Sequence, residues 1–225
     1  MSDFVGTTSL GLGLYLLLKG AGLTVLLSFA AVLLGFAIGL PVCLMRLSRS
    51  APMRRLGAFY VSFFRGVPML VQLLVIFYLL PSIGIDLGPV AAAIIAMGIC
   101  TAAYQAENLR GGFLAIPKGQ AEAARAFGYS RAQTRRHILL PQALRVATPS
   151  VVNEIILLLK ASSLVSVVGV TDLMRVSQNI VARNLNPVGW YLAASLIYLV
   201  INIGIAALGR KAETRFGRGE ARRRL

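Results

Sequence analysis

Long apolar runs, separated by short polar or basic segments, form the dominant pattern along the chain. Five runs are long enough for membrane helices, at about residues 21–45, 57–80, 88–109, 148–170 and 188–209. The hydrocarbon core of a bilayer is about 30 Å thick, and a helix needs roughly 20 apolar residues to cross it. The pattern therefore predicts an all-α, polytopic membrane protein with five transmembrane helices in one domain, residues 1–225.

A shorter apolar stretch, residues 10–18, precedes the first of these runs. Nine residues of helix are too short to cross a bilayer, and Lys19 and Gly20 interrupt the stretch before the first full span. We therefore expect a separate interfacial segment on the outer side. A signal peptide is not indicated, because Asp3 stands where a basic start is expected and no clear cleavage site follows.

Composition excludes several protein classes. The chain is 57% hydrophobic and only 14% charged, whereas a soluble domain carries about 25% charged residues. This excludes a soluble globular enzyme, a disordered protein and a fibrous one. Cys43 and Cys100 both lie inside apolar runs and form no disulfide framework or metal-ligand spacing. We predict no catalytic residue and no metal-binding residue.

The net charge is +15, from 23 Lys and Arg against 8 Asp and Glu. In a soluble protein this excess would indicate nucleic acid, but the hydrophobicity favours a membrane protein that binds none. The connections 46–56 and 110–147 and the tail 210–225 carry four, seven and seven basic residues, against three on the opposite side. The positive-inside rule then places the N-terminus outside and the C-terminus inside, with the tail on lipid of the inner leaflet.

The connection 110–147 is the one substantial loop, and its pattern predicts short helices. Pro117 suits a first helical turn, and helix-forming residues follow it. Gly128 is a left-handed stop, and Ser130 is the N-cap of a second helix through His137. Pro141 ends that helix or begins the next element. His137 has no acid or cysteine arranged beside it, so we expect it to be an ordinary loop residue.

The first short helix of this loop has an Ala-rich face. Ala123, Ala124 and Phe127 are three or four residues apart and share one face, while Glu122 and Arg125 can pair on its flank. One interpretation is a basic amphipathic hairpin on anionic lipid. The other is a docking element, in which the small Ala residues admit the groove of a partner and Phe127 is the anchor.

The sequence of this loop resembles that of a known protein family. The stretch EAARAFGYSRAQTRRHILLP resembles the EAA loop of bacterial ABC importer permeases, with the pattern at Glu122, Ala123, Ala124, Gly128, Ile138, Leu140 and Pro141. Residues 63–72, 106–120 and 158–173 resemble the polar amino acid branch, which includes the histidine, arginine, glutamine and octopine permeases. Ala161 departs from that branch, in which an acidic residue often follows the Lys.

The resemblance implies a permease of the ABC type I importer fold, with a cytoplasmic helical coupling loop, in the bacterial inner (cytoplasmic) membrane. The N-terminus would be periplasmic and the C-terminus cytoplasmic. The residues implied to dock the ATPase are Glu122, Ala123, Ala124, Arg125, Phe127 and Gly128. The implied partners are cytoplasmic ATP-binding subunits, a periplasmic substrate-binding protein and a polar amino acid. This chain has no phosphate-binding G-x-x-x-x-G-K-[ST] loop, so ATP and Mg²⁺ would bind the partner ATPase and this chain would need no cofactor.

Polar residues inside the spans are candidates for a substrate path, because they usually face the bundle interior. The set is Arg65, Gln72, Tyr104, Asn153, Glu154, Lys160 and Ser163. Asn153, Lys160 and Ser163 fall on one stripe of the fourth span. A Lys near the middle of a span costs about 2.5–3.5 kcal/mol on insertion scales, so it needs water, an acid or a ligand. Lys160 would then meet a substrate carboxylate; alternatively it snorkels or forms a fixed ion pair.

Two further spans carry polar pairs. Gly66 and Pro68 predict a break or kink in the second span, where Arg65 and Gln72, seven residues apart, would share a face. In the third span, Glu107 and Arg110 are spaced for a structural ion pair.

Three other kinds of protein compete with an ATP-driven permease. An ion-gradient-driven secondary amino acid transporter usually shows internal repeats and paired broken helices, and we find no repeat. A membrane enzyme would need a nucleophile, a base and an acid, and the chain has one His. A passive pore remains a third alternative. Because five spans are too few to enclose a gated path, we expect a second permease chain, identical or paralogous, related by a two-fold axis.

Overall fold

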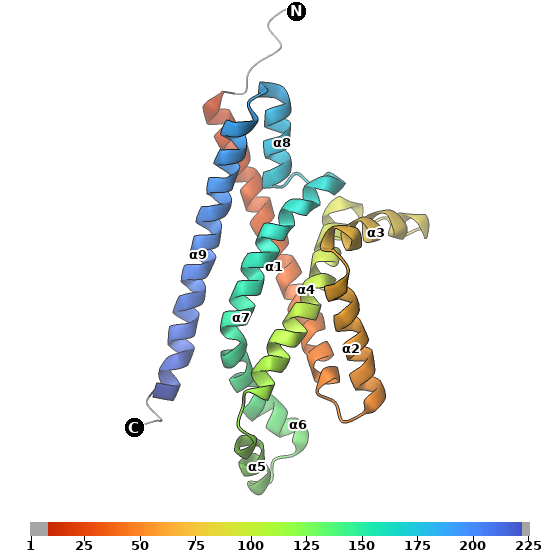
Figure 1. The fold of residues 1–225 in the computed structure, drawn as a ribbon, viewed down its shortest axis with the longest axis vertical. Coiled ribbons are helices and arrows are strands. Elements are labelled where there is room, and N and C mark those ends of the chain that lie inside the picture. Colours follow the sequence, from red (N-terminus) through yellow and green to blue (C-terminus); the bar gives the residue numbers. More distant parts are fainter. Residues whose placement is uncertain (1–8, 222–225) are drawn as a thin grey trace, which may run out of the picture.

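The structure is a computed structural model that describes the backbone of residues 9–221 and the side chains of residues 9–214. Every regular element in the described part is helical, which confirms the all-α fold class. Four long helices run along the long axis in Figure 1: α1 (Leu10–Arg46), α4 (Gly88–Leu114), α7 (Leu140–Ala161) and α9 (Pro187–Ala221). Helices α2 (Ala51–Gly66) and α3 (Met69–Ser82) form a bent pair beside them.

Shorter elements lie at the two ends of the bundle. Helix α5 (Lys118–Ala126) and helix α6 (Arg131–Gln133) lie at one end (Figure 1), where α6 continues through a π-helical segment, η1 (Thr134–Leu139), into α7. At the other end, α7 continues as a 3₁₀ segment, η2 (Ser162–Val168), and α8 (Leu173–Asn184) packs against α1 and α9. In the described part, four helical stretches are long and apolar enough to cross a membrane, and the bent pair is a fifth if taken as one span.

Helix α1 corrects the expectation for the N-terminal region. A separate interfacial segment at residues 10–18 was predicted, but one continuous helix runs from Leu10 to Arg46. Gly20 does not interrupt it. It lies so close to α8 that an added Cβ would come within 3.1 Å of the Asp172 carbonyl oxygen and of the Leu173 Cα. The glycine is therefore a packing residue, and the prediction of a break there is wrong.

The predicted break in the second span is present, and it is a sharp bend. Helices α2 and α3 meet at an angle of 101°, with Val67 extended and Pro68 just before the first residue of α3. The Gln72 amide nitrogen donates to the carbonyl oxygens of Phe64 and Val67, at 2.9 and 2.8 Å. A side chain thus satisfies backbone oxygens near the break, as irregular backbone at membrane depth requires. Arg65 and Gln72 do not share a helical face, because the chain turns between them.

The core forms where α4 packs against α1. Six alanines of α4 are at most 3% exposed, namely Ala92, Ala93, Ala96, Ala102, Ala103 and Ala106. Such small side chains let two helix backbones approach closely, which is the main source of helix association in lipid. The small residues of α4 therefore permit close contact with α1.

The connection between α4 and α7 is more helical than the sequence pattern indicated. Helix α4 extends to Leu114, and the second short helix does not end at Pro141. Pro141 lies in the first turn of α7, which confirms the alternative in which it begins the next element. The chain therefore has a nearly continuous helical path from the tip of the loop into the fourth span.

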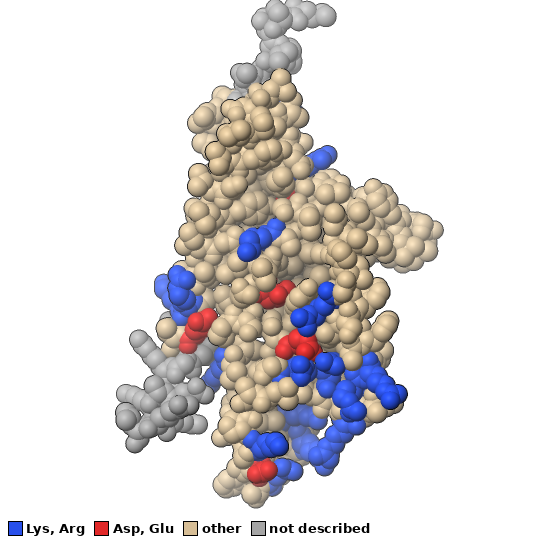
Figure 2. All heavy atoms as spheres, viewed as in Figure 1, with Lys and Arg blue, Asp and Glu red and all other residues tan. Residues whose placement is uncertain are grey.

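Charge is distributed unevenly along the long axis. Figure 2 shows Lys and Arg side chains gathered mainly toward the end where α5 and the α1–α2 turn lie, with few at the opposite end. This asymmetry is what the positive-inside rule reads as the cytoplasmic side. The orientation itself stays a prediction.

Candidate functional site

Helix α5 presents most of the predicted docking residues to solvent. Glu122, Ala123, Arg125 and Gly128 are exposed, and Phe127 is 83% exposed. Burying an aromatic ring that is already free of the fold requires no rearrangement of the chain that carries it. The tip of this loop is therefore a ready contact surface for another molecule.

Ala124 points the other way and is only 7% exposed. The expectation that Ala123, Ala124 and Phe127 share one face is therefore wrong. The reason is that consecutive residues of a helix are about 100° apart around its axis, so Ala123 and Ala124 present their side chains in different directions. Arg125 also differs from expectation, since its Nε donates to the Ala121 carbonyl oxygen at 3.1 Å and no ion pair with Glu122 forms in the described structure.

The turn after α5 is fixed by backbone geometry. Gly128 has φ +81°, the left-handed conformation that glycine adopts without a steric penalty. Its N–H donates to the Arg125 carbonyl oxygen, and the N–H of Tyr129 donates to that of Ala124, both at 3.0 Å. These bonds are the usual left-handed termination of a helix. The predicted stop at Gly128 is confirmed.

The next helix begins with the predicted cap. The Ser130 hydroxyl accepts from the Gln133 N–H at 3.3 Å, and the Gln133 side chain accepts from the Ser130 N–H at 2.8 Å. This reciprocal capping box satisfies two free donors at the start of the helix. Phe127, Gly128, Tyr129, Gln133 and His137 together line a shallow depression on the tip, so His137 lies at its edge.

A second group of predicted residues lies on α7 and η2. Asn153 and Lys160 are exposed along α7. Ser163 follows in η2, where it is half-buried and its hydroxyl donates to the Lys160 carbonyl oxygen at 2.9 Å. Polar side chains on the outside of an apolar helix are costly against lipid. This face of α7 is therefore suited to water or to a partner chain.

Residues from three helices converge beside that face. The Glu154 carboxylate on α7 accepts from the Thr101 hydroxyl on α4 at 3.3 Å. The Arg65 guanidinium at the end of α2 lies 5.2 Å from the ring centroid of Tyr104 on α4. Arg65 is also near enough for its charge to act on Glu154. The structure thus brings together two charges of opposite sign and an aromatic ring from α2, α4 and α7.

Gln72 does not join this group. It is 6% exposed, and the amide hydrogen bonds described above fix the bend between α2 and α3. Its place on a substrate path stays a prediction, while its contacts give it a structural role. Thr101 is the contributing residue that the candidate set lacked. It is the one polar residue in the stretch 88–103 and lies three positions before Tyr104, so helical spacing was the available signal.

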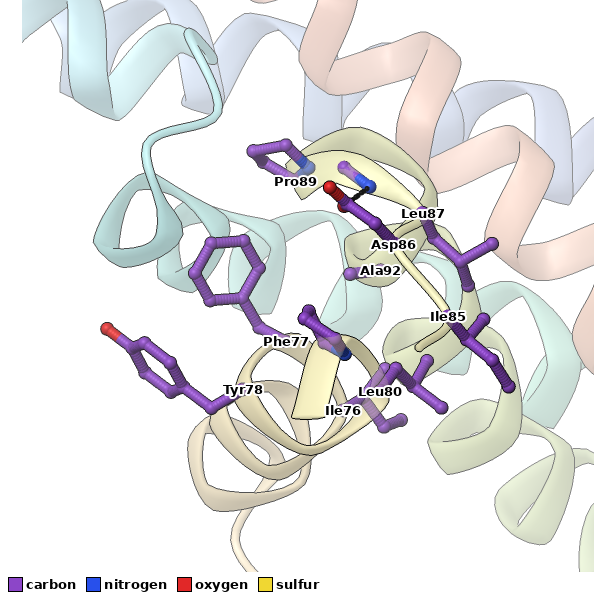
Figure 3. A pocket seen from close by; sticks show the side chains of 11 residues that line it. Ile76, Phe77, Tyr78, Leu80, Ile85, Asp86, Leu87, Pro89 and Ala92 are labelled. Atoms are coloured by element: carbon purple, nitrogen blue, oxygen red, sulfur yellow. Dashed lines mark hydrogen bonds between the residues drawn. The ribbon is translucent and has the colours of Figure 1, made fainter. Parts of the chain in front are cut away.

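A further hollow lies away from both candidate regions. It has a volume of about 260 Å³. Figure 3 shows the side chains that line it, from α3 to the start of α4. Its lining side chains are apolar apart from those of Tyr78 and Asp86. The Asp86 carboxylate accepts from the Gly88 N–H at 3.1 Å, as the dashed line in Figure 3 marks. None of the predicted site residues lines it. It offers little to hold a charged or zwitterionic solute.

Comparison with known proteins finds a matching family and similar proteins of known name. Residues 31–218 match the family described as "Binding-protein-dependent transport system inner membrane component". The L-cystine transport system permease protein TcyB of Bacillus subtilis is 37% identical over 196 residues, which cover 87% of this chain and 84% of the relative. The histidine/lysine/arginine/ornithine transport system permease protein HisQ of Salmonella typhimurium is 37% identical over 195 residues, covering 82% and 86%.

A solved structure agrees with these sequence relatives. The crystal structure of an amino acid ABC transporter with histidines superposes with a TM-score of 0.81 and 35% sequence identity. The match covers 89% of this chain and 94% of that one. The similarity therefore extends over nearly the whole bundle, including the helices that carry both candidate regions.

Proposed function

This chain belongs to the family of inner membrane components of binding-protein-dependent transport systems, and on that premise we propose that it is the permease subunit of an ATP-driven importer of a polar amino acid. The proposal rests most directly on helix α5, which carries the EAA pattern and presents Phe127 to solvent at the tip of the molecule. A permease without its own phosphate-binding loop needs such a contact with a separate ATPase.

The coupling contact follows from the shape of this tip. The exposed ring of Phe127 enters a groove on the ATP-binding subunit, and the exposed Ala123 lets the two backbones approach. Gly128 and the Ser130 cap hold the tip in one conformation, so binding orders little additional chain. Because the chain is helical from α6 through η1 into α7, a displacement at the tip is passed to the face that carries Lys160.

The path for the solute runs along α7. Lys160 and Arg65 are cations that attract the carboxylate of an amino acid, and Glu154 is an anion that attracts its ammonium group. Asn153 and Ser163 add hydrogen-bonding groups along the same helix and its continuation. TcyB and HisQ are named for transport of L-cystine and of basic amino acids, which supports a polar amino acid as the class of solute.

The second permease chain, identical or paralogous, covers the exposed polar face of α7. A single copy leaves Asn153 and Lys160 uncovered, and lipid is a poor environment for both. Two chains around a two-fold axis place these faces opposite each other and enclose the path. A periplasmic binding protein delivers the solute to the outer end, and the basic end of the bundle lies in the cytoplasm.

The test is reconstitution of the permease with its cognate ATP-binding subunit and binding protein in proteoliposomes, with labelled amino acids as solutes. We expect uptake that requires ATP and survives collapse of the proton and sodium gradients. Uptake that follows an ion gradient and ignores ATP would establish the secondary transporter in its place.

Phe127→Ala tests the docking contact within that assay. Truncating an aromatic anchor typically costs about 2 kcal/mol or more, roughly a thirtyfold loss of affinity, so the ATP-binding subunit should dissociate and uptake should fall. Tyr78→Ala is the matched control, because Tyr78 is an exposed aromatic residue on α3, far along the chain from α5. Equal loss of the ATP-binding subunit from both variants would argue against docking through Phe127.

A further inference from the structure

Helices α1 and α4 pack in very close contact, with small residues on both sides of the contact. An added Cβ on Gly39 would come within 2.9 Å of the Ala102 carbonyl oxygen and 3.1 Å of the Gln105 Cβ, so the two backbones nearly touch. The α4 side of the contact is built largely from buried alanines. Larger side chains occupy the space above other glycines of the contact, with Thr101 against Gly35 and Leu34 against Gly98.

Among the described residues, one ion pair adds a polar bond between the two helices at one end of this contact. The Arg46 Nε donates to a Glu107 carboxylate oxygen at 3.0 Å. Arg46 is the last residue of α1, and Glu107 lies on α4 about two turns before its end. Among residues 9–214, no other ion pair or side-chain hydrogen bond joins α1 to α4.

Glu107 also has a second partner, and that partner lies on its own helix. The Arg110 Nη2 donates to the other carboxylate oxygen at 2.7 Å, and the Arg110 Nε lies within 3.0 Å of both oxygens, which confirms the predicted pair at i, i+3. The two ion pairs share one carboxylate and have similar exposure, with side chains 24% and 30% exposed for Arg46 and Arg110. Only the pair with Arg46 connects two helices. The two ion pairs of Glu107 can therefore be compared directly, one within α4 and one across the interface between α4 and α1.

The position of Glu107 relates it to the coupling tip. Helix α4 ends at Leu114, and residues 115–117 connect it directly to α5. A displacement of α5 can therefore pass to the end of α4 that carries Glu107, in addition to the route through α6 and η1 into α7. The ion pair with Arg46 joins this end of α4 to the end of α1.

We propose that Glu107 is a positioning residue that locks α1 to α4 through Arg46, so that α1 and α4 move as one body when α5 is displaced. This inference rests on the proposed function, because the displacement comes from the ATPase. Its value to folding alone is small, since partly exposed ion pairs contribute little to stability. The expected effect is on the coupling between ATP hydrolysis and transport.

The test compares Arg46→Gln with Arg110→Gln in the reconstituted complex, with solute uptake and ATP hydrolysis measured in the same vesicles. Each variant removes one guanidinium and leaves Glu107 paired with the other, so neither strands a buried charge. We expect Arg46→Gln to lower the number of solute molecules moved per ATP by about fivefold or more, the lower end of typical coupling effects. Arg110→Gln should leave that ratio within about twofold.

Two further measurements separate this role from a merely structural one. The thermal unfolding temperature and the amount of assembled complex should be similar in the two variants, since their ion pairs are alike in exposure. Arg46→Gln combined with Glu107→Gln should uncouple no more than Glu107→Gln alone, because both act through one bond. An unchanged ratio in Arg46→Gln, or an equal fall in both single variants, would overturn the inference.

If the protein were not an ATP-driven importer, the same experiment would give a different result. In that case the unmodified complex would show no ATP-dependent uptake, and no ratio would exist to compare. Robust uptake by the unmodified complex, with identical ratios in Arg46→Gln and Arg110→Gln, would leave the importer intact and reject only the role of Glu107.

Discussion

Helices α4 and α7 have similar apolar character, but the bundle uses them in opposite ways. Helix α4 is enclosed, its alanines face α1, and the polar residues Thr101 and Glu107 are bonded to other helices. Helix α7 leaves more of its surface open and exposes Asn153 and Lys160. The difference teaches that burial, and not polarity alone, separates residues that hold the bundle together from residues that meet water, solute or a second chain.

The largest effect that this comparison predicts is on α7. Lys160→Met keeps the length of the side chain and removes its charge, so membrane insertion should persist while amino acid uptake is abolished. The reason is that a cation placed to meet a carboxylate has no substitute on the same stretch of helix. The assay is uptake in proteoliposomes, with the amount of inserted permease measured in parallel.

Lys19→Met is the matched control for that change, because Lys19 is also an exposed Lys in a long apolar helix but lies near the beginning of α1. It should retain uptake close to that of the unmodified permease. Normal uptake by Lys160→Met would remove Lys160 from the path and favour a snorkelling side chain.

A smaller effect is expected in the enclosed region. Gly39→Ala places a methyl group against the Ala102 carbonyl oxygen, and overpacking of this kind costs about 1–3 kcal/mol. Thermal unfolding in detergent should occur at a lower temperature.

Gly22→Ala provides the comparison within α1, since nothing lies within 4 Å of its added Cβ. It should be neutral or stabilising by about 0.5–1 kcal/mol, as expected for alanine in place of glycine in a helix. Equal behaviour of the two variants would mean that α1 and α4 are not closely packed there.

The smallest expected effect is on the pH dependence of stability. It concerns an acid that follows η2 in the chain and is buried like the residues of α4. Asp172 caps α8 by accepting from the Arg175 N–H at 2.9 Å, and its side chain is fully buried. Burial raises the pKa of this carboxyl, more than its hydrogen bonds lower it. A folded-state pKa above the unfolded value makes the group stabilising below the unfolded pKa, and that contribution is lost as pH rises through the folded pKa.

Asp172→Asn tests whether the Asp172 carboxyl makes the protein less stable as pH rises. The amide keeps an oxygen for the cap but does not titrate, so its unfolding temperature should fall less with rising pH than that of the unmodified protein. The measurement is thermal unfolding of both proteins across the acidic to neutral range. Parallel curves would show that Asp172 does not titrate differently in the folded state.

The apolar runs and the EAA loop were sufficient to predict the fold class, the stop at Gly128 and the cap at Ser130, because each depends on residues close together in the chain. Gly20 was misinterpreted, since one residue type serves both as a helix breaker and as a close-packing residue. Its role depends on α8, which lies about 150 residues further on and packs against α1.

The contacts of the candidate site show the same limit. The break at Pro68 could be predicted from local chemistry, but the hydrogen bonds of Gln72 depend on the 101° turn that follows. Likewise, the Arg46–Glu107 pair joins residues 61 positions apart, and no helical spacing indicates it. Long-range polar contacts in this bundle are set by which helices become neighbours, and an apolar pattern does not encode that choice.

The central claim is that α5 contacts a separate ATPase, and site-specific cross-linking tests it most directly. A photoreactive amino acid in place of Phe127, the exposed ring at the tip, is activated in membranes that contain the assembled transporter. The account predicts a cross-linked product between the permease and its ATP-binding subunit, with yield that changes when ATP is added. Cross-links to lipid headgroups alone, in membranes where the ATP-binding subunit is present, would contradict it and support the amphipathic hairpin instead.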